Sequence, residues 1–396
     1  MAAERFDVVV AGVGGMGSAA LLHLARRGAK VLGLERFDVP NTKGSSHGAT
    51  RIIRLAYFES PAYVPLLRRA YELWDDLERA AGETLLVQNG CLDIGPETGH
   101  VFAGAELAAR EHDIPVERLS AADVRRRYPG FAVPDGFEAL LDRAGGFLVP
   151  ERCVVQHAVQ AQAAGAVVRA REGILGWEAK SDGIHVRTER GEVIAQRLVL
   201  SAGAWMEKLG AAPKGVLVPE RQVLAWFQPK RPDLYTPEQC PVWIVDAPDG
   251  QWYGFPVHGI PGFKLGLMHH LDELVDPDDF QREPGPADEA VLRDFTERWF
   301  PEAAGPTMSL ATCMFTNTAD EHFVIDLHPD DARVVVLSPC SGHGFKFCSV
   351  VGEIAADLAL DGSTRHDIGF LALDRLTDPG AAQLKSVRRG PGHSAG

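Results

Sequence analysis

The hydrophobic pattern at the start of the chain predicts a strand, a helix and a second strand in close succession. The run FDVVVAG from Phe6 is apolar, β-branched and closed by glycine, which is typical of a strand buried on both faces. Apolar residues then recur at helical spacing until Gly28, and a second apolar run, KVLGLE, ends at Glu35. This order is a βαβ unit, which indicates an α/β protein with a parallel sheet.

Further along the chain the period of the pattern changes. Helical spacing predicts helices at 63–81, 104–112 and 153–165, and the segment 167–200 alternates as a small antiparallel sheet does. From 216 to 315, short alternating runs are separated by clusters of proline, glycine and aspartate, with helical spacing near 287–299. These runs predict a mixed or antiparallel sheet in a second domain.

Two glycine-rich segments interrupt the regular pattern. The first, NTKGSSHGATRIIR at 41–54, is polar and rich in hydrogen-bond donors, so we expect a loop there. The second, CSGHGFKF at 340–347, lies between the apolar strand RVVVLSP and the helical run SVVGEIAADLAL. This late strand, turn and helix repeat the opening pattern, so we expect the chain to re-enter its first domain.

Composition and charge exclude several classes of protein. The chain has 396 residues, of which 45% are hydrophobic and 24% charged, as in ordinary globular proteins of two or three domains. A net charge of -14 disfavours nucleic acid as a partner. We find no apolar run long enough to cross a membrane and no secretory signal, so we expect a cytoplasmic protein without membrane partners. The six cysteines are scattered, which argues against a disulfide framework or a zinc site.

The first candidate site is the sequence GVGGMG between the opening strand and helix. Gly12, Gly14 and Gly17 form a G-x-G-x-x-G motif, in which glycines allow a tight turn and the helix N-terminus binds a pyrophosphate. Glu35 ends the next strand, where it can accept hydrogen bonds from ribose hydroxyls and disfavours a phosphorylated ribose. The alternative is a glycine turn in a domain that binds nothing. The motif leaves NAD and FAD open.

Longer segments make the prediction more specific. FDVVVAGVGGMGSAA, SSHGATRIIRLAY, YVPLLRRAYELW, LVLSAGAW, WYGFP, CMFTNTADEHFVIDLHP and SGHGFKF occur in this order along nearly the whole chain. In these segments the chain resembles the monomeric sarcosine oxidase and N-methyltryptophan oxidase family of flavoproteins. The resemblance implies FAD rather than NAD as the cofactor.

The resemblance also implies a fold. We expect a discontinuous Rossmann-like FAD-binding domain, a smaller substrate domain with a largely antiparallel sheet, and a flexible tail. The expected ranges are 1–85, 146–217 and 318–385 for the FAD-binding domain, 86–145 and 218–317 for the substrate domain, and 386–396 for the tail.

Two residues acquire a specific role only through the resemblance. Cys313 matches the cysteine that carries the flavin through a thioether, whereas an isolated cysteine in such a strand is usually a core residue. Lys264 matches a buried lysine above the flavin that stabilises negative charge during dioxygen reduction, whereas a strand lysine usually reaches solvent. The matches favour FAD attached covalently to Cys313 and an oxidase rather than a dehydrogenase.

Other matching residues surround the expected substrate and flavin ring. Arg54 and Lys346 match the pair that holds the substrate carboxylate, for which a planar guanidinium and an ammonium are suited. Tyr253 matches an aromatic ligand contact. The residues expected next to the flavin are His47, Arg51, Gly342, His343, Gly344 and Lys346.

Two departures from the family pattern concern the substrate pocket. Phe315 replaces the usual tyrosine, and Ile244 replaces an unbranched methionine. Near the expected active-site histidine the chain reads KLGLMHHL, one residue longer than the family pattern. Strict spacing from Lys264 leads to Met268, the histidine match leads to His269, and strand alternation favours His270. We choose His269.

The predicted function is oxidation of the C–N bond of a small secondary amino acid, N-methyl or cyclic, such as sarcosine. The expected products are an imine, which water hydrolyses, and hydrogen peroxide from dioxygen. We see no general base among these residues, which leaves hydride transfer and direct amine attack open. We expect a monomer without a metal site. The alternatives are a D-amino-acid oxidase, an amine dehydrogenase or a non-catalytic dinucleotide-binding protein.

Overall fold

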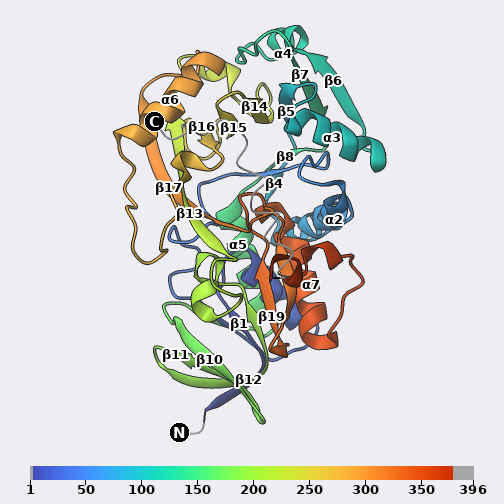
Figure 1. The fold of residues 1–396 in the computed structure, drawn as a ribbon, viewed down its shortest axis with the longest axis vertical. Coiled ribbons are helices and arrows are strands. Elements are labelled where there is room, and N and C mark those ends of the chain that lie inside the picture. Colours follow the sequence, from blue (N-terminus) through green and yellow to red (C-terminus); the bar gives the residue numbers. More distant parts are fainter. Residues whose placement is uncertain (1–2, 378–396) are drawn as a thin grey trace.

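A computed structural model describes residues 3–377, so the expected flexible tail at 386–396 lies outside the described residues. Two large sheets occupy opposite halves of the molecule (Figure 1), and the N-terminal strand lies in the half drawn at the bottom. Each half contains segments from distant parts of the sequence. A cavity between the halves must therefore be lined by residues that lie far apart in the chain.

The first sheet is built on the predicted βαβ unit. β1 (Glu4–Ala11) pairs in parallel with β2 (Val31–Leu34) and with β12 (Gly191–Leu200). β2 pairs in parallel with β9 (Val167–Arg169), and β19 (Asp331–Ser338) pairs in parallel with the end of β12. Because β19 comes from near the C-terminus, the late strand does return to the first sheet, as the repeated pattern predicts.

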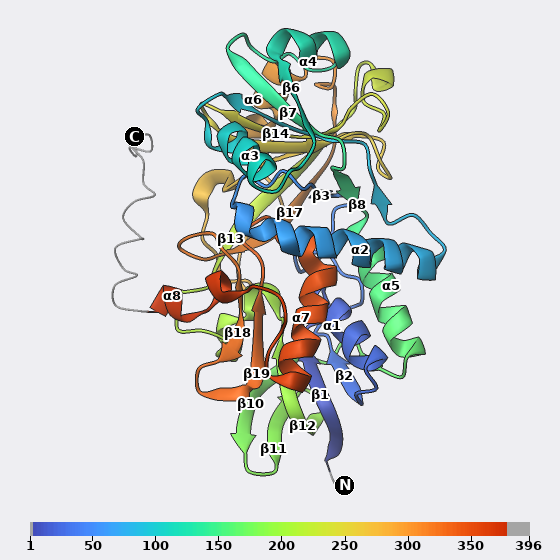
Figure 2. The same cartoon turned by 90° about the vertical axis from the view of Figure 1, so that its right-hand side faces the viewer.

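Antiparallel strands extend this sheet. They are β10 (Ile174–Lys180), β11 (Gly183–Thr188) and β18 (Val324–His328). Helices cover one face of the sheet, where α1 lies between two helices from other parts of the chain (Figure 2). These helices are α1 (Gly15–Arg26), α5 (Pro150–Ala163) and α7 (Cys348–Asp361). Buried residues of these helices pack with Val8 and Val10 of β1 in one continuous apolar core, which fixes the direction in which the N-terminus of α1 points.

The second sheet has eight strands, all antiparallel except for one neighbouring pair. Their order is β17 (Thr307–Asn317), β13 (Val218–Phe227), β16 (Phe263–Leu267), β15 (Gly250–Phe255), β14 (Val242–Ala247), β5 (Cys91–Pro96), β7 (Phe137–Asp142) and β6 (Val116–Ser120). The largely antiparallel second sheet and the mixed first sheet confirm the predicted fold class.

Aromatic residues hold the second sheet to its helix. Trp252 of β15 stacks on Phe295 of α6 (Pro286–Trp299), with the ring centroids 4.0 Å apart. Trp243 of β14 stacks on Phe300 at 4.4 Å. Because large rings contribute much buried apolar area, this cluster makes the sheet a rigid support. The remaining helices of this half are α3 (His100–Glu111) and α4 (Ala121–Arg127).

A three-stranded sheet lies between the two halves. Its strands are β3 (Arg51–Ile53), β8 (Gly146–Leu148) and β4 (Leu86–Val87). The long helix α2 (Val64–Ala81) crosses this junction (Figure 2). β3 belongs to the segment that we predict to be a loop, and its apolar residues Ile52 and Ile53 form the strand by pairing with β8.

The predicted helices occur, with differences at their ends. α2 and α6 agree closely with 63–81 and 287–299. α5 begins at Pro150 and α3 at His100, several residues before the expected starts. Proline favours the first turn of a helix, where its missing N–H costs no hydrogen bond. The domain boundaries remain a prediction.

The glycine turn after β1 gives a testable prediction about folding. A Cβ atom on Gly17 would lie 1.8 Å from the carbonyl oxygen of Gly12, so the backbone would have to move. We expect Gly17→Ala to lower the free energy of unfolding by at least about 1–3 kcal/mol, the usual cost of overpacking. The measurement is the thermal midpoint by circular dichroism. Exposed Gly369→Ala, which meets only Asp367 at 3.8 Å, is the control. Equal midpoints for the two variants would contradict this account of the turn.

Candidate active site

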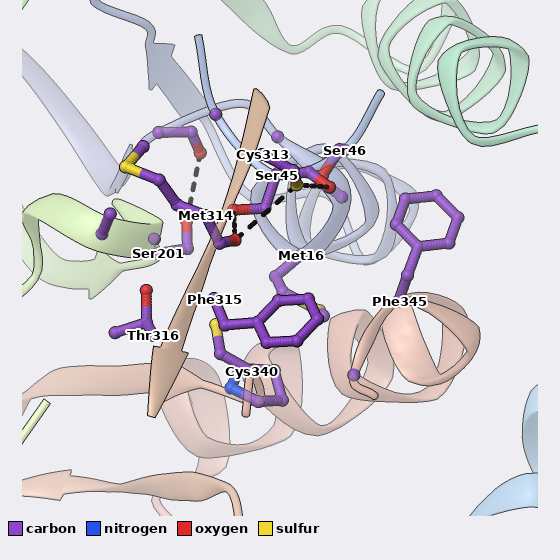
Figure 3. Close-up of a pocket in the computed structure, with 18 of the residues that line it drawn as sticks. Met16, Ser45, Ser46, Ser201, Cys313, Met314, Phe315, Thr316, Cys340 and Phe345 are labelled. Carbon is purple, nitrogen blue, oxygen red and sulfur yellow. Dashed lines mark hydrogen bonds between the residues drawn. The ribbon is translucent and has the colours of Figure 1, made fainter. Parts of the chain in front are cut away.

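One cavity of about 480 Å³ connects the glycine turn of the first sheet to the strands of the second sheet. At one end it is lined by Gly12, Gly14 and Glu35. At the other end the cavity is lined by residues of the second sheet. The loop at 44–46 and the turn at 342–346 line the cavity between these two ends. Figure 3 shows part of this wall, with Cys313 of β17 beside Ser45 and Ser46, and with Phe315 and Phe345 also labelled.

The end at the glycine turn has the shape and polarity for a dinucleotide. Gly12 has φ +91°, a conformation that favours glycine, and a Cβ atom on Gly14 would contact only Ser46, at 3.7 Å. The carboxylate of Glu35 accepts the backbone N–H of Val13 at 2.9 Å and that of Phe37 at 2.9 Å. Burial raises the pKa of Glu35, although these N–H groups lower it. The two bonds fix Glu35 at the cavity wall with a lone pair on each oxygen left over.

The thiol of Cys313 is the reactive group at the middle of the cavity. Burial raises the pKa of this thiol, but the neighbouring His47 and the charge of Arg51 outweigh burial and lower the pKa to about 7. A guanidinium nitrogen of Arg51 lies 3.9 Å from the sulfur and also donates to the carbonyl oxygen of Ser45 at 2.7 Å. This lowered pKa gives the Cys313 thiol partial thiolate character at neutral pH, which favours nucleophilic attack.

His47 lies beside this thiol and is almost fully buried. Its Nε2 atom has no hydrogen-bond partner among residues 3–377. A buried polar atom without a partner is costly, so a bound group that supplies one would be stabilised there.

The ammonium of Lys264 is buried just behind the cavity wall. It donates to the carbonyl oxygens of Gly48 at 2.7 Å and Thr50 at 2.9 Å, and to the hydroxyl of Thr50 at 3.0 Å. The ring of Phe255, which lines the cavity, lies 4.3 Å from the same nitrogen. Burial, assisted by Arg51, lowers the pKa of Lys264 well below its ordinary value. Three oxygen acceptors match the three donors of an ammonium.

Helix α5 helps to hold the acceptors of Lys264 in place. A carboxylate oxygen of Glu151, in the first turn of this helix, accepts the backbone N–H of Gly48 at 2.6 Å and of Ala49 at 3.1 Å. Ala49 has φ +68°, which is strained for a residue with a side chain. The hydrogen bonds of Glu151 thus keep this loop in the shape that presents carbonyl oxygens to Lys264.

A pair of buried cations lies at the second-sheet end. The guanidinium of Arg54 is held between the rings of Tyr57 and Phe58, at 4.5 and 4.3 Å, and donates to Glu59 at 2.8 Å. Lys346 donates to the carbonyl oxygen of His343 at 2.6 Å. Burial, with a smaller contribution from Arg54, lowers the pKa of Lys346 to about 7, although Glu59 raises it. Both Arg54 and Lys346 line the cavity.

The imidazole of His343 is neutral and has a defined tautomer. Its Nε2 atom lies 3.0 Å from the carbonyl oxygen of Glu321, which can only accept, so Nε2 carries the proton. Its Nδ1 atom then accepts the hydroxyl proton of Tyr57, at 2.5 Å. Burial lowers the pKa of His343 to about 4. A Cβ atom on Gly344 would lie 1.6 Å from the carbonyl oxygen of Pro339, so this turn requires glycine.

The three candidate positions after β16 differ in where their side chains lie. Met268 lines the cavity, whereas neither His269 nor His270 is among the described residues that line it. His269 has φ 58° and its Nδ1 lies 2.8 Å from a carboxylate oxygen of Glu220. His270 is buried and bonds to Asp288 at 2.9 Å. His269, which we chose by the histidine match, therefore points into an ion-pair network. Met268, which strict spacing from Lys264 gives, faces the cavity.

The structure brings most of the expected residues to one cavity and adds others. The expected lining residues are Gly12, Gly14, Glu35, Arg51, Arg54, Tyr253, Cys313, Gly342, His343, Gly344 and Lys346. Gly17, His47 and Lys264 lie behind the lining. Sequence reasoning missed Glu59 and Asp93, the carboxylates next to Arg54. Asp93 could have been noticed, because it interrupts the apolar strand of GCLDIGP.

Comparison with known families and relatives gives a consistent result. The family described as "FAD dependent oxidoreductase" matches residues 7–358. Monomeric sarcosine oxidase of Bacillus sp. (strain B-0618) is 40% identical, over 94% of this chain and 96% of its own length. That of Streptomyces avermitilis is 41% identical, over 94% and 98%. N-methyl-L-tryptophan oxidase of Yersinia pestis (strain Pestoides F) is 34% identical, over 94% and 99%.

Solved structures share the fold. NikD, an unusual amino acid oxidase essential for nikkomycin biosynthesis, superposes with a TM-score of 0.80 at 28% identity, covering 93% of this chain and 97% of its own. L-proline dehydrogenase from P. horikoshii superposes with a TM-score of 0.82 at 20% identity, covering 95% and 99%. No helix within residues 3–377 is long and apolar enough to cross a membrane.

The ion pairs of His269 predict a pH-dependent contribution to stability. Hydrogen bonds to Glu220 and Glu321 raise the pKa of His269 from 6.5 to about 10. Because the folded-state pKa lies above the unfolded one, the stabilisation is complete below about pH 6.5 and is lost as the pH rises to about 10. We expect His269→Gln to lower the thermal midpoint at pH 6 and to have little effect at pH 10. A difference between wild type and variant that stays constant over this range would exclude the charged pair.

Proposed function

Because this chain belongs to the family of FAD-dependent oxidoreductases that includes monomeric sarcosine oxidase, we propose that it oxidises the C–N bond of a small secondary amino acid. Sarcosine and other N-methyl or cyclic amino acids are the proposed substrates, and dioxygen is the proposed electron acceptor. The observation that carries the proposal is that an ionisable thiol, Cys313, and a buried cation pair, Arg54 and Lys346, line the same cavity as a dinucleotide-binding turn.

The residues present fit FAD in this cavity. The N-terminus of α1 and the turn at Gly12 and Gly14 would hold the pyrophosphate, and the free lone pairs of Glu35 would accept ribose hydroxyls. The thiol of Cys313 lies farther along the cavity, where the flavin ring would be. Behind it lies His47, whose Nε2 has no hydrogen-bond partner among residues 3–377. When bound, FAD supplies an acceptor for the two electrons of the C–H bond next to the substrate nitrogen.

Cys313 is the proposed covalent attachment site. Its lowered pKa gives it thiolate character without an external base. His47, on the loop between β2 and β3, and Arg51, the first residue of β3, cause the shift, so the segment that contacts the cavity also activates the thiol. Cys340 also lines the cavity, but burial raises the pKa of its thiol to about 11. The electrostatic difference between the two cysteines favours Cys313.

Arg54 and Lys346 are the proposed partners of the substrate carboxylate. The guanidinium is restrained by two aromatic rings, so little conformational entropy is lost when it binds a carboxylate. The rest of this end of the cavity is formed by Ile244, Tyr253 and Met268, together with Phe315. With Met268 and Phe315 in place of polar groups, this wall suits an apolar N-alkyl group or ring.

The residues around the position of the substrate amine exclude water but do not offer a general base. Glu59 lines the cavity but is paired with Arg54, and the pKa of Glu59 is lowered because this cation and its neighbours outweigh the burial that raises it. The carboxylate of Glu59 therefore stays ionised. Because it is paired with Arg54, it is a poor acceptor for a proton of the substrate. The amine is expected to bind in its neutral form, and we assign no catalytic role to His269 because it does not line the cavity.

Lys264 is the proposed group for reaction with dioxygen. Its charge lies beside Phe255 at the cavity wall, and it is desolvated. A fixed cation in a site that excludes water stabilises negative charge on oxygen more than a solvated lysine does. The products would be hydrogen peroxide and an imine, which water hydrolyses to an amine and an aldehyde; sarcosine would give glycine and formaldehyde.

The attachment site can be tested by changing one sulfur to oxygen. Cys313→Ser should release all yellow colour into the supernatant after acid precipitation, because a serine hydroxyl is not ionised at neutral pH. Cys340→Ser, the matched control from the same cavity, should keep the colour in the pellet. Absorbance of the two fractions measures the outcome. Colour that stays with Cys313→Ser protein would place the attachment elsewhere.

The role of Lys264 can be separated from substrate oxidation. Lys264→Met should slow reoxidation by dioxygen by roughly two orders of magnitude or more, the scale on which a preorganised charge contributes. Anaerobic reduction by substrate should change much less. Stopped-flow absorbance measures the two rates separately, and exposed Lys230→Met is the control. An equal loss in both rates would mean that Lys264 does not act on oxygen.

A further inference from the structure

Asp93 is a carboxylate buried in the middle of a strand. It lies on β5, has no exposed surface, and pairs across the sheet with Ile244 of β14 and Leu140 of β7. Neither of its oxygens has a hydrogen-bond partner among residues 3–377. Buried carboxylates are normally satisfied by several donors, so an unbonded one at the edge of a binding site requires an explanation.

The cation nearest to Asp93 is Arg54. The Nε atom of Arg54 lies 3.6 Å from a carboxylate oxygen of Asp93, which is an ion pair but too long for a good hydrogen bond. This Nε is also without a hydrogen-bond partner among the described residues. The other side of the guanidinium donates to Glu59, at 2.8 Å, and to the carbonyl oxygen of Ala56, at 3.3 Å. Arg54 is therefore shared between two carboxylates, of which Glu59 lines the cavity and Asp93 lies behind it.

Charged groups on several elements act on Asp93. Burial raises its pKa from 3.8 to about 7, with contributions in the same direction from Glu59 and Asp142, whereas Arg54 and Lys346 lower it. The thiol of Cys91 lies on the same strand, and burial raises its pKa well above the ordinary value, so it stays neutral. The residues paired with Asp93 on β14 and β7 are uncharged.

A substrate carboxylate would add a third negative charge to this cluster. The cations Arg54 and Lys346 already face the carboxylates of Glu59 and Asp93. When all four side chains are ionised, their net charge is zero. A buried excess charge is unfavourable, and binding of a proton from solvent would remove it. The ammonium of Lys346 already has acceptors in the carbonyl oxygen of His343 and the hydroxyl of Tyr57. Asp93 has no hydrogen-bond donor among residues 3–377, so protonating it breaks no such bond and it is the group at which a proton is added most easily.

We propose that Asp93 takes up one proton from solvent when a substrate carboxylate binds to Arg54, and that it thereby balances the charge of the site. Asp93 is a positioning residue that acts through Arg54. This inference rests on the proposed function, since it assumes that Arg54 binds a carboxylate. In the free protein above neutral pH, Asp93 is ionised beside the charge of Arg54. When the substrate neutralises the guanidinium, Asp93 loses its counter-charge and is protonated.

The pH dependence of ligand binding follows from this coupling. Binding raises the pKa of Asp93 above its value in the free protein, so affinity is highest at low pH and falls as the pH rises between the two values. For uptake of one proton, the Kd increases by up to tenfold per pH unit in that range. A ligand without a carboxylate should show no such dependence.

Propionate, which has a carboxylate but no amine to oxidise, is the probe, and propionamide is its uncharged counterpart. The Kd of each is measured in the holoenzyme from the change in flavin absorbance between pH 6 and 9. We expect the Kd of propionate to rise about tenfold per pH unit above neutral pH in the wild type. In Asp93→Asn, which is always neutral, it should vary by less than about twofold over the range. The Kd of propionamide should not vary with pH in either protein.

Two further measurements keep the proposal falsifiable. In the wild type, the infrared difference spectrum on binding carboxyl-labelled propionate should contain a protonated carboxyl band that does not shift with the label. In Lys346→Arg, which carries a permanent charge, the pH dependence should persist. A pH dependence that is lost in Lys346→Arg but retained in Asp93→Asn would assign the proton to Lys346 and overturn the proposal. The absence of the infrared band would also overturn it, even if Asp93→Asn does not fold.

Failure of this inference can be distinguished from failure of the proposed function. If propionate binds but its Kd does not change with pH, Asp93 takes up no proton, and the substrate assignment is unaffected. If the wild type binds no propionate and sarcosine does not reduce its flavin, the proposed function is wrong, and the role of Asp93 is wrong with it.

Discussion

The rest of the structure depends on the burial of cationic side chains around one cavity. Arg54, Lys264 and Lys346 are buried and Arg51 is half-buried, and an unpaired buried charge is so unfavourable that each needs fixed partners. Backbone carbonyl oxygens accept hydrogen bonds from Arg51, Lys264 and Lys346, and the carboxylate of Glu59 accepts one from Arg54. The cations that would act on the flavin, on oxygen and on a substrate carboxylate are thus held in place before any ligand binds.

The two sheets provide this arrangement because they are rigid and come from interleaved segments. β1 and α1 position the glycine turn, whereas β16 carries Lys264 and β17 carries Cys313 from the opposite half. The loop between β2 and β3 contacts both halves, since the carbonyl oxygen of Ser45 lies beside Cys313 and that of Gly48 accepts a hydrogen bond from Lys264. Chemistry at the junction therefore requires both halves and this loop together.

Much of this could be predicted from the sequence, because buried strands and amphipathic helices have characteristic periods. The glycine motif, Glu35 and the late return of the chain follow from local pattern, and the family resemblance points to the cavity residues. The choice among Met268, His269 and His270 could not be made from the sequence, since the left-handed backbone at His269 ends the strand alternation that continues as far as Met268. The pairing of Asp93 with Arg54 is also invisible in sequence, because it joins a residue of β5 to one just after β3, far away along the chain.

The central claim is that the buried cations select a small amino acid by its carboxylate for oxidation of its amine. The most direct test is anaerobic mixing of the purified protein with sarcosine or with sarcosinamide, which lacks the carboxylate charge, while the visible absorbance of the flavin is followed. The account predicts that sarcosine, or a larger N-methyl amino acid, bleaches the flavin and that the matching amide does not at the same concentration. Equal bleaching by acid and amide, or none by any N-methyl amino acid, would contradict it.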